Sequence, residues 1–534
     1  MEPALASDGE HEPKLPTSGS FSWKQFLAQL PLQLFLPLSL PIAALYSPAL
    51  ALNIFGLPKP ASLAHLPAVL LLLTLQGAPL VAVLAWLAMP AETAPNSLLA
   101  ATLRADALHV IVALASLRIA VSFKYAFMPS ETYARRCSTW ATTQERSEEQ
   151  LVSGWQFLKP ALVQRCLGIA AAEQHVDAAS AAVRLPRGAL PHLLAALECD
   201  EARAAVTQAI AAAEGVEACK EGVVQLRSAS ASASSHCSIP ATALSQALVL
   251  AASREASLFA GRAFILNLLT ALGSTFTTTI LRAALGAPLL GTSAAEATLI
   301  LGHIFANLFS LGVTLQFLFI GAIDHLRRAR AQALLGRLFS LRPGGRPALL
   351  PLDCPGNVQA LVAVRAMLLD FGRHFHERLV LVVSFSLITF ACVAAYVIIA
   401  LYRAPSGDLA PLLSPFILLH VLVLPALVSC GLSLHQASHA NSEMGKLGAV
   451  VVEARLHERL RRAAAARVGG EGEGEGPLLA LLGDCESLFN AQGDKGIRIL
   501  NATASGALTQ AFLGAWLSLE STALVLFLQR LYGS

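Results

Sequence analysis

Long apolar stretches alternate with long polar segments along this chain. A membrane-spanning helix needs about 20 consecutive apolar residues. Stretches of this kind occur at 66–89, 103–127, 263–285, 298–322, 379–402, 412–434 and, last, within 504–534. The pattern therefore predicts an all-α polytopic membrane protein with seven transmembrane helices.

An additional apolar segment near the N-terminus does not fit this simple pattern. Residues 27–55 include Pro37, Pro41 and Pro48, and Pro31 lies at their start. Prolines interrupt the helical hydrogen-bond ladder, so we interpret this proline-rich segment as interfacial, re-entrant or packed beneath the bundle. A true span here is the alternative. Residues 1–26, rich in Pro, Ser, Glu and Asp, are predicted to be a disordered tail.

The distribution of Lys and Arg predicts the orientation. Segments 128–262, 323–378 and 435–503 hold most of these residues, whereas the links on the opposite side, 90–101, 286–296 and 403–411, contain only Arg403. Because cytosolic loops are enriched in Lys and Arg, we expect a cytosolic N-terminus and an extracellular C-terminus.

The predicted units are a tail (1–26), the first apolar region (27–127), a cytosolic insertion (128–262), two spans (263–322), a basic amphipathic segment (323–378), two spans (379–434), an anchor helix with linker (435–503) and the final helix (504–534).

Composition supports the membrane assignment. The 534 residues are 55% hydrophobic and 14% charged, whereas soluble domains are roughly 25% charged. The mean hydropathy is +0.59. A net charge of +3 is too small to argue for nucleic-acid binding. The N-terminus lacks the basic and then apolar pattern of a cleavable signal peptide.

No pattern predicts an enzyme, a cofactor or a metal. The sequence has no Walker loop, no lipase elbow and no GxGxxG following a strand. His374, His376 and Glu377 cluster in the sequence FGRHFHER. Two histidines two positions apart on a helix point in nearly opposite directions, which disfavours a zinc site. We interpret this stretch as a solvated helix end.

The final helix carries its polar side chains in a pattern. Ser518, Thr522 and Gln529 recur at helical spacing with Leu526 between them, and small residues share their side of the helix. Such a stripe either packs against a neighbouring helix or faces water.

Charged residues also lie within the predicted spans, at Glu520 and Arg282. Intramembrane charges usually face a bundle interior or a water-filled cavity. Glu520 lies away from the polar stripe, so we expect it to face neighbouring helices. It either pairs with Arg282 or a histidine, or it acts in gating or ion attraction.

The end of the chain resembles a known signature. Thr522-Ala523, five residues and Gln529-Arg530 are similar to the C-terminal Thr-Tyr, five residues, Gln-Phe of insect gustatory receptors. The threonine and glutamine match, and Ala523 and Arg530 depart from the pattern. The segments 433–451 and LLDFGRHFHERL resemble helices that this family places after the sixth span and before the fifth.

The resemblance implies a gustatory-receptor-like ligand-gated cation channel of the plasma membrane. It would be a homotetramer whose final helix lines the pore, with Gln529 narrowing the pore and Leu526 as the apolar gate. Four leucines around a narrow axis form a constriction that dewets, and four carboxamides replace part of an ion's hydration shell. A small-molecule ligand would bind among the earlier spans, at residues that the sequence does not identify. Arg530 either turns outward or changes the selectivity.

Two other functions remain open. A secondary transporter is one, because Pro79, Pro415 and Pro425 mark possible breaks of the kind that transporters use near the midplane. A membrane scaffold is the other, with the insertion at 128–262 as its partner-binding part. A tetramer with a wet central axis would favour the channel.

Overall fold

The chain is mostly helical wherever its structure is described, which confirms the all-α prediction. The computed structural model describes residues 21–31, scattered positions between 119 and 171, and then 181–213, 236–284, 289, 294–340, 348–407, 409–419, 424–467, 476–493, 496–500 and 502–532. Most of the predicted tail and the predicted spans at 66–89 and, apart from a few positions, 103–127 lie outside these residues.

Two of the described helices have the length and composition of membrane spans. They are Leu379–Arg403, which is most of α13 (Arg373–Arg403), and the whole of α17 (Gly506–Tyr532). A helix of 27 residues is roughly 40 Å long, which exceeds the ~30 Å hydrocarbon core of a bilayer. Both helices coincide with predicted apolar stretches and support a membrane protein.

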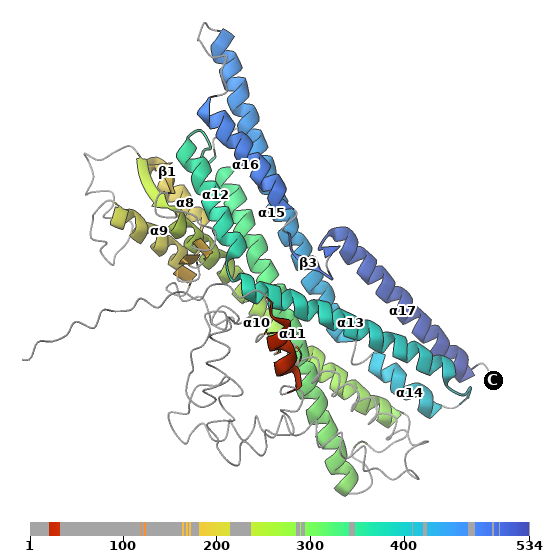
Figure 1. Ribbon diagram of the computed structural model, residues 1–534. Helices are drawn as coiled ribbons and strands as arrows, with labels where there is room; N and C mark the ends of the chain where they lie inside the picture. Colours follow the sequence, from red (N-terminus) through yellow and green to blue (C-terminus); the bar gives the residue numbers. More distant parts are fainter. Residues whose placement is uncertain are drawn as a thin grey trace, which may run out of the picture.

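Three long helices each contain an apolar part and a polar part without a break between them. They are α10 (Ala241–Ala284), α11 (Ala294–Phe339) and α15 (Leu424–Arg467). The boundaries expected at 262, 322 and 434 therefore fall inside continuous helices, which Figure 1 shows extending along the molecule.

The span predicted at 412–434 falls on parts of two helices. Helix α14 (Leu409–Ile417) covers its first part and α15 begins at Leu424, whereas residues 420–423 lie outside the described residues. Pro415 lies inside α14, and Pro425 is the second residue of α15. Proline has no amide proton to donate and crowds the preceding turn, so these two prolines stay the possible breaks that the sequence indicates.

One hydrophobic core gathers the polar ends of the long helices around a pair of strands. Strands β1 (Ala182–Pro186) and β2 (His236–Pro240) pair antiparallel, with Ala182 opposite Pro240 and Pro186 opposite His236. We call this the strand-pair core. Its other elements are η3 (Arg187–Ala189), α8 (Leu190–Ala196), α9 (Asp200–Ala213), α12 (Pro355–Asp370) and α16 (Pro477–Gly493), with parts of α10, α11 and α15.

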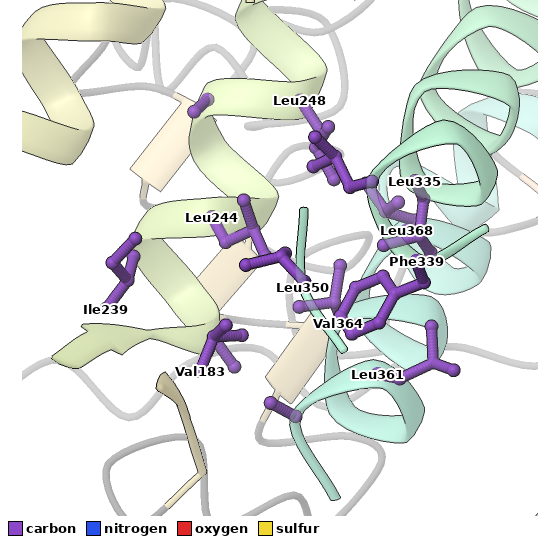
Figure 2. Close-up of a cluster of buried hydrophobic side chains, with 14 of the residues drawn as sticks. Val183, Ile239, Leu244, Leu248, Leu335, Phe339, Leu350, Leu361, Val364 and Leu368 are labelled. Carbon is purple, nitrogen blue, oxygen red and sulfur yellow. The ribbon is translucent and has the colours of Figure 1, made fainter. Parts of the chain in front are cut away.

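Side chains from distant parts of the sequence fill the strand-pair core. Figure 2 shows Val183 and Ile239 from the two strands beside Leu244 of α10, with Leu335 of α11 and Leu361 of α12 across from them. All five are fully buried. The insertion predicted at 128–262 thus contributes to a core shared with the rest of the chain.

A buried asparagine attaches the strand pair to α12. The side chain of Asn357, which is 1% exposed, accepts a hydrogen bond from the Arg184 amide (2.7 Å) and donates to the Arg184 carbonyl (3.2 Å). It also donates to the Pro351 carbonyl at 2.7 Å. This carboxamide satisfies the open edge of β1 as a third strand would, which fixes the strand pair against the helices.

A second hydrophobic core surrounds the two candidate spans, and we call it the span core. It contains Leu315 of α11, Val383 and Leu401 of α13, Leu412 of α14 and Cys430 of α15. One side of α17 packs on this core, and two-residue strands β3 (Arg498–Ile499) and β4 (Ala502–Thr503) precede that helix. Helices α13 and α17 lie side by side at one edge of the molecule (Figure 1).

Candidate functional site

Helix α17 is packed along one side and uncovered along the other. Only Thr509 and Ala523 of its 27 residues are buried. The packed side includes the half-buried Trp516, Leu519 and Phe527, which contact the span core. An apolar helix with this much exposed surface has room for lipid, a second copy of the chain, or both.

The predicted polar stripe lies on the uncovered side of α17. Ser518, Thr522 and Gln529 are all exposed. The Ser518 hydroxyl donates to the Gly514 carbonyl at 2.9 Å, and the Thr522 hydroxyl donates to the Ser518 carbonyl at 2.8 Å. These hydrogen bonds to the preceding turn satisfy the hydroxyl protons of Ser518 and Thr522 within the helix. The two hydroxyl groups therefore tolerate an apolar setting.

The predicted gate and the intramembrane charges occupy other positions. Leu526 is half-buried, packs partly on the span core, and borders the polar stripe. Glu520 is half-buried on the packed side of α17. Arg282 belongs to α10, but its side chain lies outside the described residues. The expected pairing of Glu520 with Arg282 therefore stays a prediction.

The N-terminal end of α17 is held by an asparagine of α15. The Asn441 side chain accepts a hydrogen bond from the Ile497 amide (2.8 Å) and donates to the carbonyls of Ile497 (3.0 Å) and Ala504 (2.8 Å). The Leu500 amide, at the turn between β3 and β4, donates to the hydroxyl of Ser384 on α13 at 3.0 Å. These contacts position the segment through which α16 connects to α17.

The C-terminal end of α17 is held by the link between α13 and α14. The Arg530 guanidinium donates to the Tyr402 carbonyl at 2.5 Å and lies 5.4 Å from the centroid of the Tyr402 ring. The Gly407 amide donates to the Arg530 carbonyl at 2.9 Å. One turn earlier on α17, the rings of Phe527 and Phe416 lie 4.2 Å apart. The Arg530 side chain thus contacts its own subunit, which is neither of the two alternatives drawn from the sequence, an outward-turned side chain or a changed selectivity.

A buried ionic cluster joins the strand-pair core to the span core. Asp324 of α11 is 2% exposed and binds the guanidinium groups of Arg327 and Arg328, the latter at 2.9 Å. Arg328 also donates to the carbonyls of Leu369 (3.2 Å) and Phe371 (2.7 Å), where α12 ends and α13 is about to begin. The cluster therefore fixes the angle between α12 and α13.

Two histidines complete this ionic cluster. His376 of α13 contacts the Asp324 carboxylate through Nδ1 at 3.2 Å. His325 is fully buried, with its Nδ1 3.0 Å from the Ser433 carbonyl of α15 and its ring 5.4 Å from that of His376. The interpretation of His376 as part of a solvated helix end was wrong, because its side chain is 15% exposed and contacts Asp324 and His325 of α11. Among the described residues, no three His, Cys, Asp or Glu side chains are arranged so that they could hold a metal ion, and this includes Asp324, His325 and His376.

Burial and charge set the protonation of the ionic cluster. Burial by itself raises the pKa of Asp324, but the charges of Arg328 and Arg327 outweigh it and hold that pKa well below its usual range. Burial lowers the pKa of His325 to about 3. Burial and then the charge of Arg328 lower the pKa of His376, although Asp324 opposes the shift. At neutral pH the cluster is one carboxylate between two guanidinium groups, beside two neutral imidazoles.

Comparison with known proteins adds no family to this geometry: no protein-family model matches the chain, and neither does any curated protein. Sequence reasoning identified the stripe on α17 but missed Asn441, Tyr402 and the Asp324 cluster. An aspartate followed by two arginines three and four positions later is a pattern that indicates local pairing. Nothing in the sequence indicated that 52 residues further on a histidine would join it.

Proposed function

We propose that this protein is a gustatory-receptor-like ligand-gated cation channel of the plasma membrane, a homotetramer in which α17 lines a central pore. One observation carries the proposal. A span-length apolar helix at the edge of the subunit leaves uncovered the side that bears Ser518, Thr522 and Gln529.

Physical chemistry favours a wet axis in front of this side. A carboxamide facing lipid loses its hydrogen bonds to water, at a cost of several kcal/mol against a fully apolar reference. Gln529 avoids that cost if four copies of α17 surround a water-filled pore. Four carboxamides at one level then offer carbonyl oxygens to a partly dehydrated cation.

Two apolar residues flank the stripe, and either is positioned to close the pore. Leu526 follows Thr522 by one helical turn and is half-buried. Val525 borders the stripe on its other flank and is 50% exposed. We assign the gate to Leu526, because its side chain is larger than that of Val525 and closes a narrow axis more completely.

A second exposed apolar surface supports assembly. Val452, Leu456 and Leu460 follow one another at four-residue spacing on the polar part of α15, with exposed fractions of 45%, 56% and 61%. They lie on one face of a helix whose neighbouring residues are charged. Water is a poor neighbour for this face, and another copy of the same helix covers it in a symmetric assembly.

The test is whole-cell current without ligand from cells expressing wild type, Leu526→Ala, Val525→Ala or Leu524→Ala. Leu524→Ala is the matched control, since Leu524 is exposed on the side of α17 away from the stripe. We expect a leak current in Leu526→Ala and none in the control. Adding Gln529→Ala to Leu526→Ala should change the permeability ratios among Na⁺, K⁺ and Cl⁻.

Surface labelling and subunit counting complete this experiment. All variants must reach the plasma membrane in similar amounts, and the purified protein should contain four copies. A leak in Val525→Ala alone would move the gate by one residue. Silence of every variant at the surface would overturn the channel.

A secondary transporter is the alternative, supported by Pro415 inside α14 and Pro425 in the first turn of α15, which are prolines of the kind that break helices near the midplane of transporters. It predicts a monomer or dimer that takes up substrate without a leak current in Leu526→Ala. The same assay therefore separates the two functions.

A further inference from the structure

The C-terminal end of the proposed pore helix carries a positive charge that a cation pathway must keep away from its axis. Arg530 directly follows Gln529. Four copies of the subunit would therefore bring four guanidinium groups to the level of the four Gln529 carboxamides around the pore axis. Four positive charges around a pore entrance raise the local concentration of anions and repel cations.

The structure holds this charge against the link between α13 and α14. The Arg530 guanidinium donates to the Tyr402 carbonyl at 2.5 Å and lies over the Tyr402 ring, 5.4 Å from its centroid. Tyr402 is in the last turn of α13 and Arg530 in the last turn of α17. The guanidinium is thus near the negative ends of two helix dipoles, which adds to its attraction to this position.

A backbone contact closes the same link from the other side. The Gly407 amide donates to the Arg530 carbonyl at 2.9 Å. The φ angle of Gly407 is +80°, which glycine adopts without strain. The Arg530 side chain and backbone are therefore both bound to residues 402–407, and we call this set of contacts the Arg530 clasp.

We propose that the clasp with Tyr402 and Gly407 determines specificity, because it keeps the charge of Arg530 off the pore axis so that the entrance selects cations. This inference rests on the proposed channel function. It differs from an ordinary structural role in one respect. Breaking the clasp should change selectivity only when the charge at position 530 is present.

The experiment uses the Leu526→Ala background, which is expected to conduct without ligand, and measures the Na⁺/Cl⁻ permeability ratio from reversal potentials. Gly407→Pro removes the amide donor and requires a negative φ angle, so it opens the clasp. We expect it to lower the ratio roughly three- to tenfold, the effect of four charges about 10 Å from the axis in screened water.

Two further variants separate charge from structure. Arg530→Gln removes the charge, and should leave the ratio close to that of the background. The double variant Gly407→Pro with Arg530→Gln should recover the background ratio, because it has no charge to release. Arg403→Gln is the matched control, since it removes an exposed cation at the end of the same helix, α13.

The outcomes distinguish this inference from the channel proposal. Absence of current in both Leu526→Ala and Val525→Ala overturns both. Current with an unchanged ratio in Gly407→Pro overturns the clasp alone, and so does an equal fall in the double variant. If Gly407→Pro fails to reach the surface, Tyr402→Leu replaces it: it removes the aromatic face and should lower the ratio in the same direction by a smaller factor.

Discussion

The replacement of Asp324 by asparagine should destabilise the protein more than any other single change of charge within the ionic cluster. Asparagine preserves the shape of the side chain and removes the negative charge that Arg327 and Arg328 share. Removing one partner of a buried ion pair costs about 3–5 kcal/mol, because the remaining charge is left uncompensated. Arg328 keeps its bonds to the Leu369 and Phe371 carbonyls, so we expect a value near 3 kcal/mol.

This free energy converts into a measurable shift of the melting temperature. With an unfolding entropy of about 2 cal/mol/K per residue, a cooperative chain of this length loses roughly 3 °C for 3 kcal/mol. The assay is thermal unfolding in detergent with a dye that becomes fluorescent on reacting with thiols. Cys199, Cys237, Cys430 and Cys485 are buried free cysteines that react only as the chain opens. The exposed Cys392 is replaced by serine throughout to lower the background.

An exposed pair of the same kind provides the control. Asp200 is 87% exposed and binds Arg203 at 3.1 Å with the same three-residue spacing that joins Asp324 to Arg327. Exposed pairs contribute about 0–1 kcal/mol, so Asp200→Asn should melt within about 1 °C of the wild type. Equal melting temperatures for Asp200→Asn and Asp324→Asn would refute the reasoning, because the burial of Asp324 would then have no energetic consequence.

Two further predictions concern pH and the attachment of α17. The pKa of His325 falls to about 3 on folding, so the unfolded chain binds a proton near pH 6.5 that the folded chain does not. Stability should therefore be fully present above pH 6.5 and decline by up to about 1.4 kcal/mol per unit as the pH falls toward 4. His325→Asn should flatten this decline when the melting temperature is measured against pH, and His192→Asn, at an exposed histidine, should not. Equal slopes of melting temperature against pH in the two variants would contradict the burial argument. Asn441→Ala should speed hydrogen exchange of the Ile497 amide, because this amide loses its acceptor. The control Asn490→Ala, on the exposed side of α16, should leave the exchange rate of the Ile497 amide unchanged. Slow exchange of this amide in Asn441→Ala would show that the asparagine does not hold the segment.

The parts of the fold that could be predicted from sequence are those determined by local pattern. The apolar stretches at 379–402 and 504–534 became α13 and α17, because an uninterrupted run of that length has few alternatives to a helix. The polar stripe of α17 followed from spacing alone.

Contacts between distant segments could not be predicted. Strands β1 and β2 are five residues each and about fifty residues apart, and alanine-rich helical sequence lies between them. Their alternation of buried Val183 and Leu185, and of Cys237 and Ile239, is a period-two signal. It is too short to stand out in a mostly helical chain. His376 likewise gave no local sign that it would face Asp324.

The way α17 is attached limits how this helix can move. Asn441 and Ser384 hold the segment before its first turn, and Arg530 holds its last turn. Between these ends the uncovered side has no neighbour within the subunit among the described residues. A helix held at both ends does not slide along its axis without breaking these contacts. It rotates or tilts more easily. In a tetramer, a rotation of α17 would exchange Leu526 for the polar stripe at the axis, because Leu526 borders that stripe. The residues that attach the helix are thus expected to alter gating, although none of them lines the pore.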